Sequence, residues 1–406
     1  MTAQKPVRDV RIDFFRGLAL IIIFVNHMPG NAAGYFTPRA YGLSDAAEIF
    51  IFLAGLSSAM AFGRSFDRAG FLAGLGRVVQ RIWQLYRAHI GLFIVICGVI
   101  VAANSLFAEP NYISRLGIDR FFLDPGRSLV DLLSLRYVPN YFDILPLYIV
   151  LLAALPAIVL MARISPALVV MTSAVLYVGA IIGDWNLMAD TTTGRTWFFN
   201  PFAWQVLFVA GYGYGAGWFE IPQATRTRVT AAAVYLVFAG ALALSLMRLD
   251  YDLFAGVRDI LEPMARKTDV GPLRLLHFFA LAYLTVCLLQ AAPTLITPRR
   301  AEPVALMGRH SLSVFLLGMA LSFIGGIVLD QTGAGLLPHL VVNLGGIALL
   351  WAWAYGAAWF NGQPWKRRTD GAARPAPSYR IQRAARTLPM PAPAMARLRL
   401  APRRAL

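Results

Sequence analysis

Apolar stretches of about 20 residues recur along nearly the whole chain. A helix of about 20 residues crosses the roughly 30 Å hydrocarbon core of a bilayer. Of the 406 residues, 58% are hydrophobic and 14% are charged, whereas a soluble domain carries about 25% charged residues. The sequence therefore predicts an all-α polytopic membrane protein.

Breaks at proline, glycine and charge clusters divide this apolar sequence into about ten transmembrane helices. The predicted spans lie near residues 14–30, 45–63, 82–106, 142–162, 166–183, 199–218, 228–247, 273–291, 303–329 and 338–360. The ninth is long enough to be tilted or broken. All ten belong to one predicted transmembrane domain, residues 1–365.

Basic residues in the short connections predict the orientation, because Lys and Arg concentrate on the cytoplasmic side. Four connections or ends that fall on one face are basic: Lys5, Arg8 and Arg11; Arg64, Arg68 and Arg77; Arg226 and Arg228; Arg299 and Arg300. The longer loops 107–141 and 248–272 balance Arg with Asp and Glu. Both termini are therefore predicted to be cytoplasmic.

The net charge of +16 comes mainly from the C-terminal segment. Residues 366–406 hold eleven basic residues and one acid, a net charge of +10. With several prolines and no apolar periodicity, the segment is predicted to be a disordered cytoplasmic tail. Attraction to anionic headgroups of membrane lipids is sufficient to explain its charge, and no nucleic acid partner is expected.

Arg16 and His27 are the most informative polar residues, since ionisable groups inside a span are costly and usually functional. They are eleven positions apart, and 11 × 100° is within roughly 20° of three full turns of a helix. Both side chains should therefore leave one face, about 16 Å apart along the axis. Because they bracket the apolar core, we expect this segment to be retained and not removed as a signal peptide.

Such a pair suits a long, thin substrate with an anionic head and a reactive group deep in the membrane. A guanidinium binds phosphate in a bidentate fork, and a neutral imidazole can take a proton from an attacking hydroxyl. An acyl-coenzyme A thioester (acyl-CoA) has this shape. In the structural alternative, Arg16 extends to lipid headgroups and His27 hydrogen-bonds a neighbouring helix.

Basic residues at the start of the third span are candidates for binding the acyl donor. These are Arg77, Arg81 and Arg87. Arg77 and Arg81 are one helical turn apart, so they could form a phosphate clamp with Arg16. Anchoring of the helix at the cytoplasmic surface explains them almost as well.

A second set of polar residues lies at the starts of spans on the side opposite the cytoplasm, where an acceptor or the acyl group would bind. It consists of Asp45, Glu48, Asp143, Asn200, Trp204, Gln205, Lys267, Arg274 and His277. Aromatic rings, amides and charges are what a carbohydrate or dicarboxylate site needs. Alternatively, Asp45 and Glu48 are ordinary helix-start residues, and the aromatic residues form an interfacial belt.

Other familiar sites are not expected. Cys97 and Cys287 both lie in apolar runs and are interpreted as buried small hydrophobic residues. No metal site and no permanently bound cofactor is predicted.

Arg16, ten residues and then His27 resemble the signature of the transmembrane acyltransferase superfamily, also called acyltransferase family 3. Four further stretches resemble the OpgC family: Asp13-Phe-Phe-Arg16-Gly, Asp143-Ile-Leu-Pro146-Leu-Tyr148, Phe199-Asn200-Pro201-Phe-Ala-Trp204-Gln205 and Gly308-Arg309-His310-Ser311-Leu-Ser-Val-Phe. The similarity covers about residues 8 to 360.

This resemblance implies a ten-helix enzyme of the bacterial inner membrane that transfers succinyl groups from cytoplasmic succinyl-CoA to osmoregulated periplasmic glucans. It implies that His27 is the catalytic base and that Arg16 supports the acyl donor. Ala54 departs from the commoner superfamily pattern, in which a serine often precedes the glycine. The acceptor, a periplasmic glucan or another envelope polysaccharide, is therefore less firmly implied than the reaction.

Two other classes of function stay open. A transporter or flippase for an anionic or glycan substrate would use Arg16, Arg274 and the histidines to line its pathway, and would move the substrate without cleaving a thioester. A scaffold would depend on its basic tail and lose function on deletion of residues 366–406.

Overall fold

The computed structural model describes residues 9–107, 110–218, 226–248, 255–333 and 335–365. The predicted basic tail, residues 366–406, lies outside them. Within the described ranges the regular elements are helices, and the only β-type pairings are isolated bridges joining Tyr137 to Asp190 and Met188 to Thr196. The all-α fold class is confirmed.

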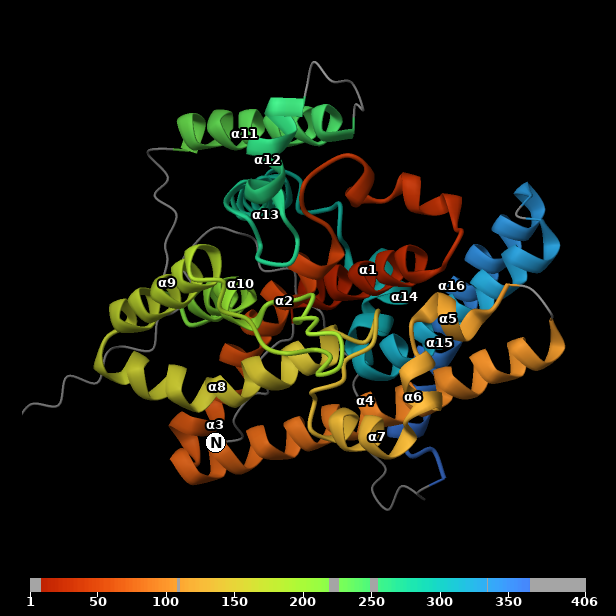
Figure 1. Cartoon of the computed structure of the whole chain (residues 1–406). Coiled ribbons are helices and arrows are strands. Elements are labelled where there is room, and N and C mark those ends of the chain that lie inside the picture. The colour runs from red at the N-terminus through yellow and green to blue at the C-terminus, as the bar shows by residue number, and fades with distance from the viewer. Residues whose placement is uncertain (1–8, 108–109, 219–225, 249–254, 334, 366–406) are drawn as a thin grey trace, which may run out of the picture.

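The chain runs through sixteen labelled α-helices in the described residues (Figure 1). Their bounds are α1 Val10–His27, α2 Ala46–Ser58, α3 Arg64–Arg68, α4 Phe71–Leu106, α5 Tyr112–Leu116, α6 Asp119–Leu123, α7 Pro125–Leu133, α8 Ile144–Ile164, α9 Pro166–Ile182, α10 Pro201–Gly215, α11 Arg226–Arg248, α12 Ala255–Ala265, α13 Pro272–Ala291, α14 Pro298–Arg309, α15 Ser311–Thr332 and α16 Leu336–Asn361. Two 3-10 turns, η1 Ala32–Phe36 and η2 Pro38–Ala40, lie between α1 and α2, and a π-helical turn, Ala59–Gly63, joins α2 to α3.

Seven helical segments of the described chain are long and apolar enough to cross a membrane. They are Ala46–Arg68, Phe71–Leu106, Ile144–Ile164, Thr227–Arg248, Pro272–Ala291, Ser311–Thr332 and Leu336–Asn361. The other three predicted spans coincide with α1, α9 and α10, of 18, 17 and 15 residues. The total of ten spans and the cytoplasmic placement of the termini stay predictions.

Two predicted spans have different bounds in the structure. The predicted span 82–106 is only the C-terminal part of α4, which begins at Phe71 and has 36 residues. The polar residues near the start of α4 lie outside the apolar stretch, but the helix continues through them. The predicted span 303–329 is divided at His310 between α14 and α15.

Reciprocal glycine contacts bring two helix pairs into backbone contact. A Cβ on Gly17 of α1 would lie 1.9 Å from the Val304 carbonyl oxygen of α14. In the second pair, a Cβ on Gly55 of α2 would lie 2.0 Å from the Phe208 oxygen of α10, and one on Gly211 2.0 Å from the Phe52 oxygen. Small residues allow such approaches where burial from water does not drive helix association.

Helix α1 lies at the centre of the described bundle (Figure 1). It packs against α2, α14 and α15, while α4 packs against α8 and α15. The green helices α11 to α13 form one edge in Figure 1, and the blue helices α15 and α16 lie toward another. The first helix is therefore enclosed by segments from distant parts of the sequence.

The replacement Gly55→Ala should destabilise the protein. Its methyl group would meet the Phe208 carbonyl at 2.0 Å, so α2 and α10 must separate, at a cost of about 1–3 kcal/mol. The control is Gly345→Ala on α16, where a Cβ meets nothing within 4 Å. Thermal unfolding in detergent micelles measures both variants. Equal melting temperatures would contradict the close-packing account.

Candidate functional site

One uninterrupted helix, α1, carries both Arg16 and His27. At the Arg16 end, the Nη2 atom of the guanidinium donates to the Ser57 hydroxyl and to the Leu53 carbonyl, the latter at 3.3 Å. Both acceptors belong to α2, which begins at Ala46 beyond the other end of α1 and ends at Ser58. The two helices are therefore antiparallel.

Arg16 lies in the wall of a cavity of about 330 Å³, which we call the basic cavity. Residues of α1, α2, α4, α8 and α15 line it. Its polar lining consists of Arg16, Ser57, Ser58, Arg77, Gln80, Arg81, Gln84, Tyr148 and Ser311. Three guanidinium groups around one cavity are suited to an anionic ligand, and above all to phosphate.

The three arginines of α4 that were predicted to bind the donor have different surroundings in the structure. Arg77 donates to the Ala61 carbonyl at 3.0 Å and to the Ser65 hydroxyl at 2.5 Å, and Arg81 donates to the Gln84 side chain at 3.1 Å. Both line the basic cavity with Arg16. Arg87 is not among the cavity residues, and its guanidinium lies 5.6 Å from the ring centroid of Trp83.

The basic cavity extends along α2 toward the His27 end of α1. Its wall includes Phe62 and Phe50, which are twelve residues apart, or about 18 Å along a helix. Ile144 and Leu145, at the start of α8, also line the cavity. These residues follow closely after Tyr141, whose ring centroid is 5.6 Å from that of His27. His27 itself is not one of the lining residues.

A backbone contact fixes the tautomer of His27. Its Nδ1 atom lies 2.8 Å from the carbonyl oxygen of Ile23. Because a carbonyl can only accept a hydrogen bond, Nδ1 carries the proton in the neutral ring. The lone pair on Nε2 is then the basic atom, as proton abstraction requires.

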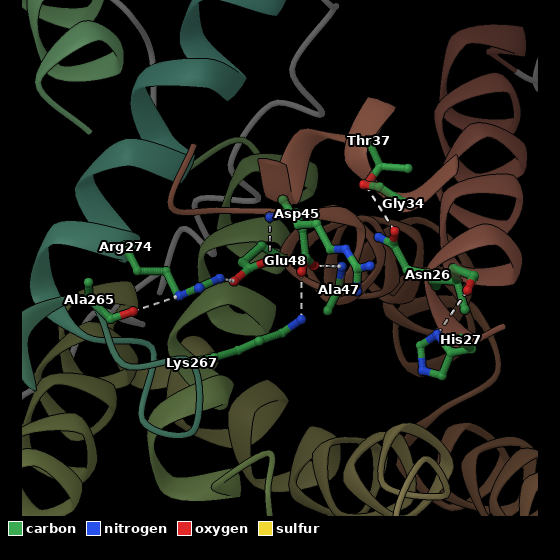
Figure 2. Close-up of polar contacts among 12 residues, drawn as sticks. Asn26, His27, Gly34, Thr37, Asp45, Ala47, Glu48, Ala265, Lys267 and Arg274 are labelled. Carbon is green, nitrogen blue, oxygen red and sulfur yellow. Dashed lines mark hydrogen bonds and ion pairs between the residues drawn. The ribbon is translucent and has the colours of Figure 1, made fainter. Parts of the chain in front are cut away.

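Two carboxylates at the start of α2 form buried ion pairs with residues from a distant segment (Figure 2). Lys267 Nζ lies 2.5 Å from Asp45 Oδ2, and Arg274 Nη1 lies 2.7 Å from Glu48 Oε1. Asp45 also accepts from the Ala47 N–H at 2.9 Å, while Glu48 accepts from the Asp45 N–H at 2.9 Å. We call these four residues the ionic quartet.

The structure confirms the helix-start interpretation of Asp45 and Glu48, and their role in binding an acceptor stays a prediction. Both residues form the capping box of α2, and both are paired with the predicted cationic residues. Glu48 has no exposed side-chain surface, whereas 29% of the Lys267 side chain is exposed. Since protein carboxylates already pair with both cations, a substrate carboxylate would have to compete with Asp45 for Lys267.

Asn200 and Trp204 hold the backbone that carries Lys267. The Asn200 amide donates to Asp269 Oδ1 at 2.9 Å, and the Trp204 indole donates to the Thr268 carbonyl at 3.0 Å. Gln205 instead binds Ser173 of α9, accepting from its hydroxyl at 2.7 Å. Asn200 and Trp204 therefore position the quartet, and Gln205 links two helices.

The remaining predicted residues are buried near the same ends of the helices. His277 Nδ1 lies 2.8 Å from the Ser44 hydroxyl, next to the quartet residue Asp45. Asp143 precedes α8 and is 5% exposed. Its Oδ1 atom has no hydrogen-bond partner among the described residues.

Two residues that contact Arg16 and His27 were not among the predicted site residues. Ser57 was missed because a lone serine in an apolar helix rarely indicates function, although it lies one turn after Leu53. Tyr141 is one of several aromatic residues near the span starts, and its residue type alone indicates no role. Its position over His27 depends on a loop conformation that periodicity does not reveal.

Fold and site together define a helical integral membrane protein with a basic cavity beside its first helix. Residues 8–362 match the family described as OpgC protein, and the chain belongs to this family. No curated protein and no solved structure matches the chain. Family membership points to glucan succinylation as the general activity.

Breaking one ion pair of the quartet should strongly destabilise the protein. Arg274→Met leaves the fully buried Glu48 carboxylate without its guanidinium, which costs about 3–5 kcal/mol. The double variant Arg274→Met/Glu48→Gln should recover most of the loss. Unfolding by denaturant in micelles measures the free energies.

Arg266→Met is the matched control, since the Arg266 side chain is 54% exposed and lies 3.4 Å from Asp269. Its loss should cost no more than about 1 kcal/mol. A small loss in Arg274→Met, or no recovery in the double variant, would contradict the role assigned to the Glu48–Arg274 pair.

Proposed function

We propose that this protein is an O-acyltransferase of the bacterial inner membrane. It moves an acyl group, succinyl by family resemblance, from cytoplasmic acyl-CoA to hydroxyl groups of periplasmic glucans. The observation that carries the proposal is the basic cavity, which brings Arg16, Arg77 and Arg81 together and runs along α2 toward the His27 end of α1.

The donor binds with its phosphates at the three arginines. Coenzyme A is anionic at the nucleotide end and narrow along the pantetheine arm. The cavity supports this orientation, because the same lining that contains the arginines also contains the apolar residues Phe50, Ile144 and Leu145. With the nucleotide at the arginines, the thioester points toward Tyr141 and His27.

His27 then acts as a general base. The Nε2 atom removes the proton from a glucan hydroxyl while the hydroxyl oxygen attacks the thioester carbonyl carbon. The carbon–sulfur bond breaks, and the coenzyme A thiolate leaves and takes up the proton from Nε2, which restores the neutral imidazole. The Ile23 carbonyl supports this step, because it holds the Nδ1 proton and orients Nε2.

The alternative is a transporter or flippase that moves its substrate unchanged. An Nε2 lone pair suits both functions, since histidines also relay protons in transporters, and family membership favours the enzyme. In a reconstituted system the two functions differ in one product. Only the transferase releases free coenzyme A.

His27→Ala should abolish acyl transfer, because it removes the atom that takes the proton. General-base catalysis contributes about 10²–10⁴-fold, so the rate should fall at least that far. The measurement is release of coenzyme A from succinyl-CoA by the purified protein in lipid nanodiscs with a glucan acceptor. Full activity in a folded variant would refute the role of His27.

Arg77→Ala and Arg81→Ala should each raise the KM for acyl-CoA about tenfold or more, because each removes a charge-assisted contact to phosphate. The KM for the glucan should not change. Arg87→Ala is the matched control on the same helix, since Arg87 lies outside the basic cavity. Equal effects of all three replacements would show that the arginines act only through surface charge.

A further inference from the structure

Tyr141 occupies a strained position in the turn before α8. The Phe142 N–H donates to the Pro139 carbonyl at 3.1 Å and closes a four-residue turn, in which Tyr141 is the third residue with φ of 73°. A positive φ at this position favours glycine or asparagine. A tyrosine keeps an unfavourable backbone there, which indicates that its side chain has a role.

A network of loop contacts holds the chain that leads into this turn. Val138 donates through its N–H to the Ala189 carbonyl at 2.8 Å and accepts from Arg195 at 2.5 Å. Nearby, Arg120 pairs with both Asp131 and Asp190. The Thr191 hydroxyl and then the Arg120 guanidinium lower the pKa of Asp131, although burial opposes them.

The turn directs the Tyr141 ring over the interior of the bundle. Its centroid lies 5.6 Å from that of His27 and 5.8 Å from that of Phe323 in α15. Phe323 is 4% exposed, whereas Tyr141 is 42% exposed. Tyr141 therefore offers a partly exposed ring beside the proposed base.

We infer that Tyr141 is the docking ring for a pyranose unit of the acceptor glucan, and that it positions the attacking hydroxyl beside His27. This inference rests on the proposed function and names its acceptor-side positioning residue. Aromatic rings cover the C–H faces of sugars and exclude water from them. Directly after the turn, at the start of α8, Ile144 and Leu145 line the cavity proposed for the donor. Tyr141 therefore lies where acceptor and donor would meet.

The direct test is binding of a linear glucose oligosaccharide to the full chain in lipid nanodiscs, without any acyl donor. Tyr141→Leu should weaken binding about tenfold, because the ring contact is lost, while Tyr141→Phe should bind like the wild type. Tyr214→Leu is the matched control, since Tyr214 is 44% exposed but lies on α10. It should leave binding unchanged.

Kinetics with succinyl-CoA provide the second readout. Tyr141→Leu should raise the KM for the glucan about tenfold and leave the KM for acyl-CoA unchanged. A merely structural tyrosine would lower activity without this separation.

Equal oligosaccharide binding by wild type and Tyr141→Leu, or equal weakening by Tyr214→Leu, would overturn the inference and leave the proposed transferase intact. Conversely, Tyr141-dependent binding without His27-dependent release of coenzyme A would refute the proposed function and support the docking role.

Discussion

Moving a charge from water into hydrocarbon is costly, so a membrane protein must give each buried ionic group a partner or a wet cavity. This constraint accounts for the two polar regions of the described bundle. Arg16 binds Ser57 and the Leu53 carbonyl at the edge of the basic cavity. At the other end of α2, Glu48 is fully buried and pairs with Arg274. Arg16 and Glu48 therefore each have a protein partner inside the described bundle.

Close backbone packing between helices fixes the positions of these polar side chains. Gly17 brings α1 against α14, and Gly55 brings α2 against α10. Helix α2 then presents Ser57 to Arg16 near one end and Glu48 to Arg274 near the other. A small displacement of α2 would disturb both contacts. The basic cavity and the ionic quartet are thus two consequences of the same helix packing.

Local patterns were enough to predict the helical class, most of the long apolar helices and the presence of Arg16, Arg77 and Arg81 around one cavity, whereas their binding of the donor stays a prediction. These predictions depend on hydropathy and on the period of a single helix. Partner choice could not be predicted, because it depends on contacts between segments that are 64 to 222 residues apart in the sequence. Examples are Asp45 with Lys267, and the use of Asn200 and Trp204 to hold that segment. The sequence groups Arg87 with the donor site only because it is a basic residue near the start of the third predicted span, and it lies outside the cavity.

The central claim is that one cavity links Arg16 to the His27 end of α1 and holds the acyl donor along that path. Cryo-electron microscopy of the protein with a non-hydrolysable thioether analogue of succinyl-CoA tests it most directly. The account predicts phosphate density in contact with Arg16, Arg77 and Arg81, and the acyl carbonyl next to Nε2 of His27. An analogue bound outside this cavity, or one with its acyl group remote from His27, would contradict the account.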